Sequence, residues 1–353
     1  MSGKARLRDV AERAGVSEAT VSRVVNGKSG VAEPTRQAVL KVLRELGYEP
    51  AGLGRPTGVG AVGVVLPELD NPTFPLYAQA IEARVARAGL ATIVCTATLT
   101  GTAESVYIDL LLDRGVSGLV FVSGLHADTT ADHSRYCQLH EQGVPFVCVN
   151  GALVDLDVPA VSADERTAGC EAVEHLLALG HRRIGLAVGP ERYQPVIRRL
   201  EGYRHTLADA GCAEFVRAGD FSVEGGHAAA MGLLEVGVTA IVAASDLMAL
   251  GAVRAVRQRG LCVPEDVSVV GYDDTPLMAY TDPPLTTFRQ PIRAIGTAAA
   301  GALLTEIDGP GRAPRGEHLF RAELVTRRST ALAPELARPA SEPSGAVAAA
   351  DSA

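Results

Sequence analysis

Short apolar runs alternate with amphipathic helical patterns over most of residues 61–290. The runs begin at residues 61, 91, 118, 145, 183, 239 and 267, with the sequences AVGVVLPEL, ATIVCTA, GLVFVSG, PFVCVNG, RIGLAVG, TAIVAAS and VSVVGYDD. Helical patterns between them include 77–89, 107–115, 169–180 and 247–260. Continuous apolar strands separated by helices are typical of parallel sheets covered on both faces. The alternation of strands and helices occurs twice, over roughly residues 61–160 and 161–290. It therefore predicts an α/β fold with two lobes, each built on a parallel sheet.

A different pattern occupies the N-terminus. Apolar residues at helical spacing place one face of a first helix in a core: Leu7, Val10, Ala11 and Ala14. Gly15 favours the end of this helix, and Ser17 suits the cap of a second one. The second helix stops at Asn26 and buries Val21, Val24 and Val25. Two short helices joined by a Gly-containing turn predict a helix-turn-helix, and an ordinary helical hairpin is the alternative.

The exposed face of the second helix has the side chains that a DNA groove accommodates, which are Glu18, Ala19, Ser22 and Arg23. A third helix is predicted from Pro34, which fits a first turn, to Tyr48, with Gly47 at its end. Its buried face consists of Val39, Val42, Leu43 and Leu46. Three helices in so short a segment predict a self-contained N-terminal domain.

The charge is distributed unevenly along the chain. Residues 1–55 contain ten Lys and Arg against six Asp and Glu, whereas the remainder has 23 basic and 35 acidic residues. A basic head on an acidic body suits a DNA-binding module attached to a larger domain that does not touch DNA. At 353 residues the chain has room for two or three domains. The N-terminal residues have the pattern of a helix with a polar face and not that of a signal peptide. No apolar run reaches the length of a membrane span. We therefore expect a cytoplasmic protein without a membrane partner.

Six cysteines are scattered without C-x-x-C spacing, at Cys95, Cys137, Cys148, Cys170, Cys212 and Cys262. Most lie in apolar runs, which predicts reduced, buried thiols in a cytosolic protein.

The chain resembles the LacI/GalR family of bacterial transcription regulators. The resemblance rests on LRDVAERAGVSEATVSRVVNG from Leu7, the Thr35-Arg36 pair, GY-x-P at 47–50, VPEDVSVVGYDD at 263–274 and PPLTTFRQP at 283–291. It spans roughly residues 5 to 330. It implies a periplasmic-binding-protein-like core of two lobes, in which the final segments cross back into the first lobe and a ligand binds in the cleft between the lobes.

The expected organisation follows from this resemblance. Residues 1–48 form the helix-turn-helix domain and residues 49–60, rich in Gly and Pro, form a hinge linker. Residues 61–330 form the bilobal domain for effector binding and dimerisation. Residues 331–353, rich in Ala, Pro and Ser, form a disordered tail.

The DNA-contacting residues are interpreted from chemistry and from the family. Arg23 can donate two hydrogen bonds to guanine, at O6 and N7. Glu18 can accept a hydrogen bond from cytosine N4, or it can disfavour other bases by repulsion. The resemblance implies that Glu18, Ala19 and Arg23 read bases. It implies phosphate contacts for Ser17, Thr20, Ser22 and Asn26. Helix capping is the alternative for Ser17 and Thr20, and Lys4 and Arg6 are interpreted as nonspecific phosphate contacts.

The linker departs from the family pattern. Members continue after GY-x-P into a hinge helix with a Leu that wedges into the minor groove, but here Thr57 replaces that Leu and Pro56 precedes it. Several glycines also disfavour a helix. Leu53 as a wedge and Arg55 in a narrow minor groove are the two alternatives.

The resemblance maps the effector residues onto the sensor domain. They are Phe74 in NPTF, Asn150, Arg199, Phe221, Ser245, Asp246 and Asp273. All are expected at strand ends or in the loops after them, where open α/β sheets bind ligands. Packing within a lobe is the alternative for Phe74 and Phe221, while packing explains Arg199 and Asp273 less easily, because a buried charge needs a partner.

Two segments, residues 121–136 and 173–203, resemble maltose-type regulators of actinobacteria. This resemblance implies maltose or a longer maltodextrin as the effector.

Other motifs are interpreted as coincidental. Gly58, Gly60 and Gly63 spell G-x-G-x-x-G, but they precede a strand instead of opening a helix, so no cofactor is expected. His126, His133 and His140, with Asp128 and Asp132 nearby, are interpreted as a solvated helix face and not as a metal site. Cys137 lies near no base, and neither a G-x-S-x-G elbow nor a Walker loop occurs, so no catalytic residue and no enzyme are predicted.

Three functions compete. The first is a homodimeric, sugar-responsive repressor that binds a double-stranded DNA operator. The second is a solute-binding protein or sugar-handling enzyme, which leaves the basic head unexplained. The third is an architectural DNA binder without a ligand, against which the Arg199 and Asp273 charges argue.

Overall fold

The computed structural model describes residues 7–25, 31–32, 34–35, 38–39, 41–42, 60–97, 103–309 and 311–334. In the head, α1 (Leu7–Ala14) ends at Gly15, whose φ of +65° is in the left-handed region that glycine tolerates, and α2 (Glu18–Val25) follows. Residues 34, 35, 38, 39, 41 and 42 are helical. The head core contains Val10, Ala11, Val21, Val24 and Val39. The predicted first and second helices are confirmed; Leu43, Leu46 and Gly47 lie outside the described residues, as does most of the linker.

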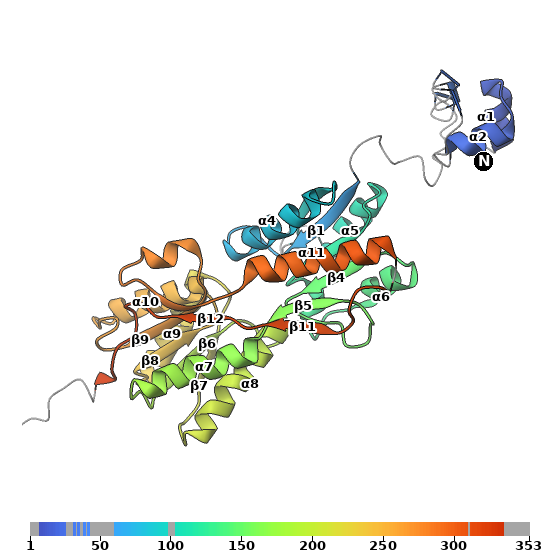
Figure 1. The fold of residues 1–353 in the computed structure, drawn as a ribbon. Helices are drawn as coiled ribbons and strands as arrows, with labels where there is room; N and C mark the ends of the chain where they lie inside the picture. Colours follow the sequence, from blue (N-terminus) through green and yellow to red (C-terminus); the bar gives the residue numbers. More distant parts are fainter. Residues whose placement is uncertain are drawn as a thin grey trace, which may run out of the picture.

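The first lobe is built on a six-stranded parallel sheet (Figure 1). Its order is β11 (Glu317–Phe320), β5 (Ala160–Ala163), β4 (Phe146–Val149), β3 (Leu119–Val122), β1 (Ala61–Leu66) and β2 (Ala91–Thr96). Helices α4 (Thr73–Ala86) and α11 (Ile292–Asp308) cover one face, and α5 (Glu104–Asp113) and α6 (Ser134–Glu141) cover the other. A short 3₁₀ helix, η1 (Leu125–Ala127), follows β3.

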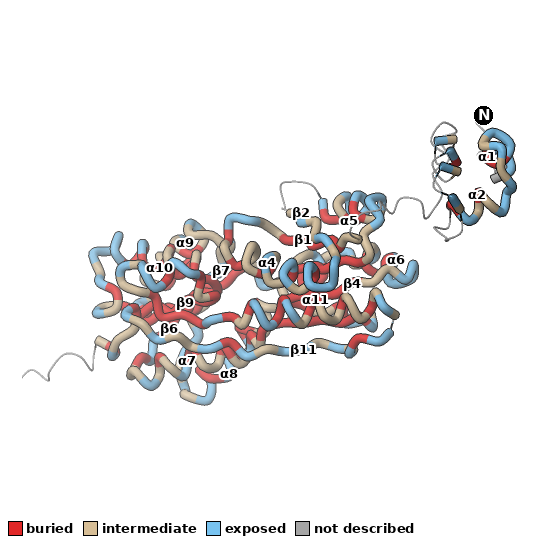
Figure 2. The backbone as a smooth tube through the Cα atoms, turned by 45° about the horizontal axis from the view of Figure 1, so that its top comes forward, coloured by how far each residue is buried: buried red, intermediate tan, exposed pale blue. Residues whose placement is uncertain are grey.

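Strand β3 shows why these residues form such a sheet. Leu119 and Phe121 pack on the α5–α6 side, whereas Val120 and Val122 pack on the α4–α11 side. All four side chains are buried, so the strand is apolar on both faces (Figure 2). The two apolar layers explain the continuous hydrophobic run in the sequence.

The second lobe repeats the plan with the order β12 (Glu323–Val325), β10 (Thr286–Arg289), β9 (Ser268–Asp273), β8 (Ala240–Ala243), β6 (Ile184–Val188) and β7 (Phe215–Ala218). The pairs are parallel except that β12 runs antiparallel to β10. Helices α7 (Glu165–Ala178) and α8 (Gln194–Asp209) pack on one face, and α9 (Val223–Glu235) and α10 (Asp246–Gln258) on the other. A 3₁₀ helix, η2 (Pro276–Ala279), follows β9.

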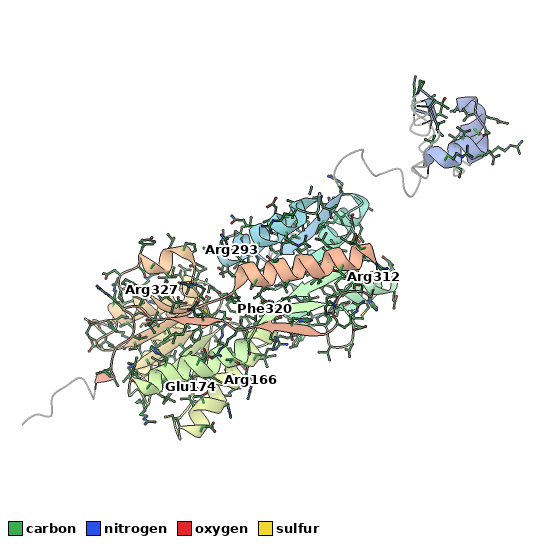
Figure 3. The ribbon with its side chains drawn as sticks, viewed as in Figure 1. Arg166, Glu174, Arg293, Arg312, Phe320 and Arg327 are labelled. Atoms are coloured by element: carbon green, nitrogen blue, oxygen red, sulfur yellow. The ribbon has the colours of Figure 1, made fainter. Side chains whose placement is uncertain are left out.

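The chain passes between the lobes three times: from β5 to α7, from β10 to α11 and from β11 to β12. The expected return of the final segments to the first lobe is confirmed. Phe320 ends β11 just before the last crossing (Figure 3). The predicted boundary between the two lobes, near residue 161, lies a few residues too early. Residues 160–163 pair with β4 and β11 and so belong to the first sheet.

Three further expectations are corrected. Residues 331–334, assigned to the disordered tail, contact the second lobe, where the Ala333 amide donates to the Leu179 carbonyl at 2.9 Å; residues 335–353 lie outside the described range. His126 and Asp128 are buried and not on a solvated helix face, since the His126 ring bonds the Val149 carbonyl. The six cysteines are free, but only Cys95 and Cys148 are buried, whereas Cys137, Cys170 and Cys212 are half-buried and Cys262, in the loop before β9, is exposed.

Within the described ranges, no cluster of three or more His, Cys, Asp or Glu could hold a metal ion. The same residues include no helix long and apolar enough to cross a bilayer. Gly63 of the G-x-G-x-x-G motif lies inside β1, where a Cβ would come within 2.8 Å of Leu111 and Leu119, so close packing explains this glycine.

Candidate functional site

The exposed face of α2 is the candidate DNA interface. Glu18, Ala19 and Arg23 are exposed, and Ser22 is half-buried. Ser17 caps the helix, because its Oγ accepts from the Thr20 amide at 3.2 Å and lies 2.9 Å from the Thr20 hydroxyl. The capping alternative for these two hydroxyls therefore has direct geometric support. Asn26 and Arg55 lie outside the described residues.

This face has the chemistry that a major groove requires. Arg23 presents a forked donor to solvent, and Glu18 is an exposed acceptor in the first turn of the helix. Val21 and Val24 point the other way, into the head core, and so fix the orientation of the exposed side chains. The helix can therefore present donors and acceptors to base edges without disturbing its own packing.

The second candidate site lies where the carboxyl ends of the strands in both sheets face the other lobe. In the described part of the chain, the non-glycine residues with positive φ all lie there: Ser123 after β3, Asn150 after β4, and Asp273 and Asp274 at the end of β9. Their φ angles are 48°, 63°, 118° and 54°. Such conformations are uncommon for residues other than glycine, although Asn and Asp adopt them more readily than most, and they cluster at functional sites.

A chain of hydrogen bonds connects the lobes inside this region. Asn150 Nδ2 donates to the Ser123 hydroxyl at 3.1 Å, and the Tyr77 hydroxyl lies 3.5 Å from Asn150 Oδ1. The Tyr77 hydroxyl donates to Gln290 Oε1 at 2.8 Å, and Gln290 Nε2 donates to Asp273 Oδ1 at 2.6 Å. We call these five residues the inner chain. It joins first-lobe side chains to Asp273 of the second lobe through Gln290, which lies at the second crossing.

Arg199 finds its ion-pair partner within the second lobe. Its guanidinium donates to Glu165 Oε2 and, through Nη1, to the Ala244 carbonyl at 2.6 Å. The guanidinium also lies 3.6 Å from the centre of the Tyr272 ring, whose hydroxyl donates to Glu165 Oε1 at 2.9 Å. The expected position of Arg199 at a strand end is wrong, because the residue lies within α8; its ion-pair partner is Glu165.

Two carboxyl groups lie close together at the end of the second sheet. Asp246 accepts from the Thr275 amide at 2.7 Å and from the Thr287 hydroxyl at 2.6 Å. Burial raises the pKa of Asp246 to about 6. Burial, together with the neighbouring Asp246 charge, also raises the pKa of Asp273. A group that donates hydrogen bonds or brings positive charge to this site would favour the ionised forms.

The remaining expected residues have packing partners in the structure. Ser245 caps α10 by accepting from the Met248 amide at 3.2 Å. Phe74 is half-buried against the α4–α11 core. Phe221 lies in the loop after β7, with its ring 6.3 Å from that of Tyr193 and against Gly189, where a Cβ would clash with it. Packing within the lobe therefore accounts for part of the surface of both aromatic rings.

The structure brings together residues that the sequence did not single out: Tyr77, Glu165, Tyr272 and Gln290. Gln290 lies in the PPLTTFRQP motif, and Tyr77 follows the NPTF loop by one helical turn, so those positions in the motifs were the available signal. A surface hollow of about 460 Å³ is lined by residues 152–158 and Gly316, away from these side chains. The polar candidate effector side chains are buried, and each is hydrogen-bonded to another group of the protein: Asn150, Arg199, Ser245, Asp246 and Asp273.

The comparisons agree with this geometry. A family model described as "Bacterial regulatory proteins, lacI family" matches residues 6–51, and one for a periplasmic binding protein-like domain matches residues 173–330. The HTH-type transcriptional regulator MalR of Streptomyces coelicolor is 53% identical over 95% of this chain and 99% of its own length. The repressor CytR of Escherichia coli is 34% identical over 94% of this chain and 97% of its own length.

Solved structures give the same result. The transcriptional regulator CelR in complex with cellobiose superposes with a TM-score of 0.69 at 33% identity, covering 92% of this chain and 99% of that one. The lac repressor dimer bound to operator and an anti-inducer also gives 0.69, at 32% identity, covering 93% of this chain and all of that one. With its helix-turn-helix head and its bilobal α/β body, the chain belongs to the lacI family of bacterial regulatory proteins and is a transcriptional regulator.

Proposed function

We propose that the protein is a homodimeric repressor of carbohydrate-utilisation genes, and that a small sugar bound between its lobes relieves repression. The observation that carries the proposal is the presence, in one chain, of an exposed polar face on α2 and an enclosed polar region between two lobes. A solute-binding protein needs only the second of these features.

On DNA, each protomer places α2 in a major groove of a pseudopalindromic operator. Arg23 and Glu18 read base edges, with Ala19 beside them. Phosphate contacts come from Ser17, Thr20, Ser22 and Asn26. Arg55 contributes positive charge at the operator centre, where the linker meets the DNA.

In the cleft, Asp273, Asn150 and Arg199 bind sugar hydroxyls, since carboxylate, amide and guanidinium groups together supply both donors and acceptors. Ser245 and Asp246 support the second-lobe side of the site, and Phe74 and Phe221 offer faces for a sugar ring. The inner chain already satisfies several of these groups, so the sugar must replace those hydrogen bonds as it binds.

Maltose or a maltodextrin is the proposed effector. The support is the likeness of residues 121–136 and 173–203 to maltose-type regulators, together with a structural neighbour that binds another disaccharide, cellobiose. Induction requires that the sugar bind the lobe arrangement with low operator affinity more tightly than the one with high affinity.

The proposal assigns domains as well. Residues 1–48 bind DNA, 49–60 link the two parts, 61–334 bind effector and dimerise, and 335–353 form the C-terminal tail. We place the protein in the cytoplasm, where its DNA lies, and assign it no enzymatic activity, because its relatives are transcriptional regulators.

Fluorescence anisotropy tests the proposal directly, with DNA from the gene's own upstream region and added maltose, maltotriose or cellobiose. We expect tight, salt-sensitive binding that maltose or maltotriose relieves. If cellobiose alone releases the protein from DNA, cellobiose and not a maltodextrin is the effector. If the protein binds DNA tightly and none of the three sugars weakens this binding, the assignment of a sugar effector is contradicted. An absence of specific binding would contradict the regulator itself.

Truncation separates the competing functions. Removing residues 1–60 deletes the head and linker but leaves both lobes intact. We expect the truncated protein to bind sugar and to lose all operator binding. A truncated protein that retains every measurable activity would favour the solute-binding function instead.

A further inference from the structure

A second set of contacts, separate from the inner chain, connects the lobes along the start of α8. Arg192 Nε donates to Asp128 Oδ2 at 2.7 Å, and the Thr129 amide donates to the Arg192 carbonyl at 2.9 Å. Asp128 and Thr129 belong to the first-lobe loop after β3, whereas Arg192 belongs to the second lobe. The two loops thus meet as a short antiparallel bridge between residues 128 and 193.

The contacts continue along the helix. The Gln194 side chain accepts from the Ala152 amide at 3.0 Å and donates to the Ala152 carbonyl at 2.8 Å. One turn further, Arg198 grips Glu317 of β11 with two hydrogen bonds, at 2.7 and 2.6 Å. Figure 1 shows the start of α8 beside β11.

The carboxylates of these ion pairs are sheltered from solvent. The Asp128 and Glu317 side chains are 10% and 15% exposed and those of Arg192 and Arg198 are 36% and 27% exposed. Arg204 of the same helix and its partner Glu214, just before β7, are each about half exposed. Burial opposes ionisation of Asp128, but hydrogen bonds from Thr130 and the Arg192 guanidinium together lower its pKa. Sheltered, two-pronged pairs stabilise a conformation more than exposed pairs do.

We propose that the contacts of Arg192, Gln194 and Arg198 with the first lobe form a clasp that holds the two lobes together, so that opening of this clasp limits sugar entry. The entry of a sugar rests on the proposed function, whereas the contacts of the clasp do not. Because the polar candidate effector residues are buried in this arrangement, a sugar reaches them only after the lobes separate. The clasp residues are positioning residues that need not touch the sugar.

Hydrogen–deuterium exchange of the ligand-free full-length protein tests the clasp without any effector. The reporter is the peptide containing Thr129, whose amide bonds across the lobes. We expect Arg198→Met and Glu317→Gln each to speed its exchange, by about three- to tenfold, because opening becomes less costly. The matched control is Arg204→Met, which removes the exposed pair within the second lobe, and it should leave this exchange unchanged.

A disulfide across the bridge gives the converse test. The Asp128 and Tyr193 positions form a non-hydrogen-bonded antiparallel pair, whose Cα atoms lie about 4.5 Å apart, within the range for a disulfide. In the Asp128→Cys/Tyr193→Cys variant, we expect oxidation to slow maltotriose uptake at least about 100-fold and dithiothreitol to restore it. Single-cysteine variants under the same oxidant control for the six native cysteines.

The outcomes separate the clasp from the sugar assignment. Unchanged exchange in both Arg198→Met and Glu317→Gln, or rapid maltotriose uptake by the oxidised double variant, would overturn the clasp. Faster exchange in a protein that binds no maltotriose would establish the clasp and refute the proposed effector.

Discussion

The head and the body use polar side chains in opposite ways. In the head, Arg23 and Glu18 project from a helix whose other face forms a small valine-rich core. In the body, Arg199, Asp246 and Asp273 are almost completely buried and bonded within the protein. Substitutions at the DNA face should therefore alter DNA binding alone, whereas substitutions in the cleft should alter both the stability of the body and its sugar binding.

The largest expected effect is the loss of the buried guanidinium. Arg199→Met leaves Glu165 buried without its ion-pair partner, and we expect the free energy of unfolding of the body to fall by about 3–5 kcal/mol. Urea denaturation of residues 61–353 measures this change. The control, Arg204→Met, removes a half-exposed pair and should cost less than about 1 kcal/mol. Equal losses of unfolding free energy in the two variants would contradict this difference between buried and exposed polar side chains.

Asp246 gives the next largest effect, through pH. Its pKa is about 6 in the folded protein, above its ordinary value, so the folded state binds the proton more tightly than the unfolded state does. The free energy of unfolding therefore loses a contribution as pH rises from about 4 to 6, on the order of 2 kcal/mol. In Asp246→Asn this loss should be absent, so the stability difference, variant minus wild type, should increase across that range. A difference that is constant with pH would contradict the assignment.

Arg23→Ala tests the head. We expect a loss of about 1–3 kcal/mol of operator discrimination per contact, because a bidentate grip on guanine disappears. Anisotropy with operator and scrambled DNA measures this loss, while the denaturation curve and sugar affinity should stay unchanged. Arg13→Ala, at an exposed position on α1, is the matched control and should retain operator preference. If the Arg23→Ala variant still prefers operator over scrambled DNA as strongly as the wild type does, Arg23 does not read a base.

Tyr77→Phe gives the smallest effect and examines the inner chain. It removes the hydroxyl that donates to Gln290, leaving a buried acceptor without its partner, and should cost about 1–2 kcal/mol of stability. Sugar affinity should change as well, because Gln290 holds Asp273. Calorimetric titration with maltotriose checks the second expectation, and unchanged affinity would separate the inner chain from the effector site.

The architecture was largely predictable because it depends on local patterns. Apolar periodicity located α1, α2 and the central strands, since parallel strands buried on both faces need continuous apolar runs. Short or less apolar segments such as β7 and β12 lack that signal, and their pairing depends on neighbouring strands. The solvated-face interpretation of His126 was wrong because its burial comes from tertiary contacts, with Tyr136 of α6 and with the Val149 carbonyl of β4.

Local sequence patterns were sufficient to predict the head, the alternating α/β body and the segments that supply polar residues to strand ends. The choice of partner for each polar side chain depends instead on the tertiary structure, which brings together Arg199 with Glu165, Asp273 with Gln290, and Arg198 with Glu317. Each pair joins elements far apart in the chain, from 17 residues apart for Gln290 and Asp273 to 119 for Arg198 and Glu317. Periodicity reports which face of an element is buried, but partners across a cleft depend on how the lobes fold back on each other.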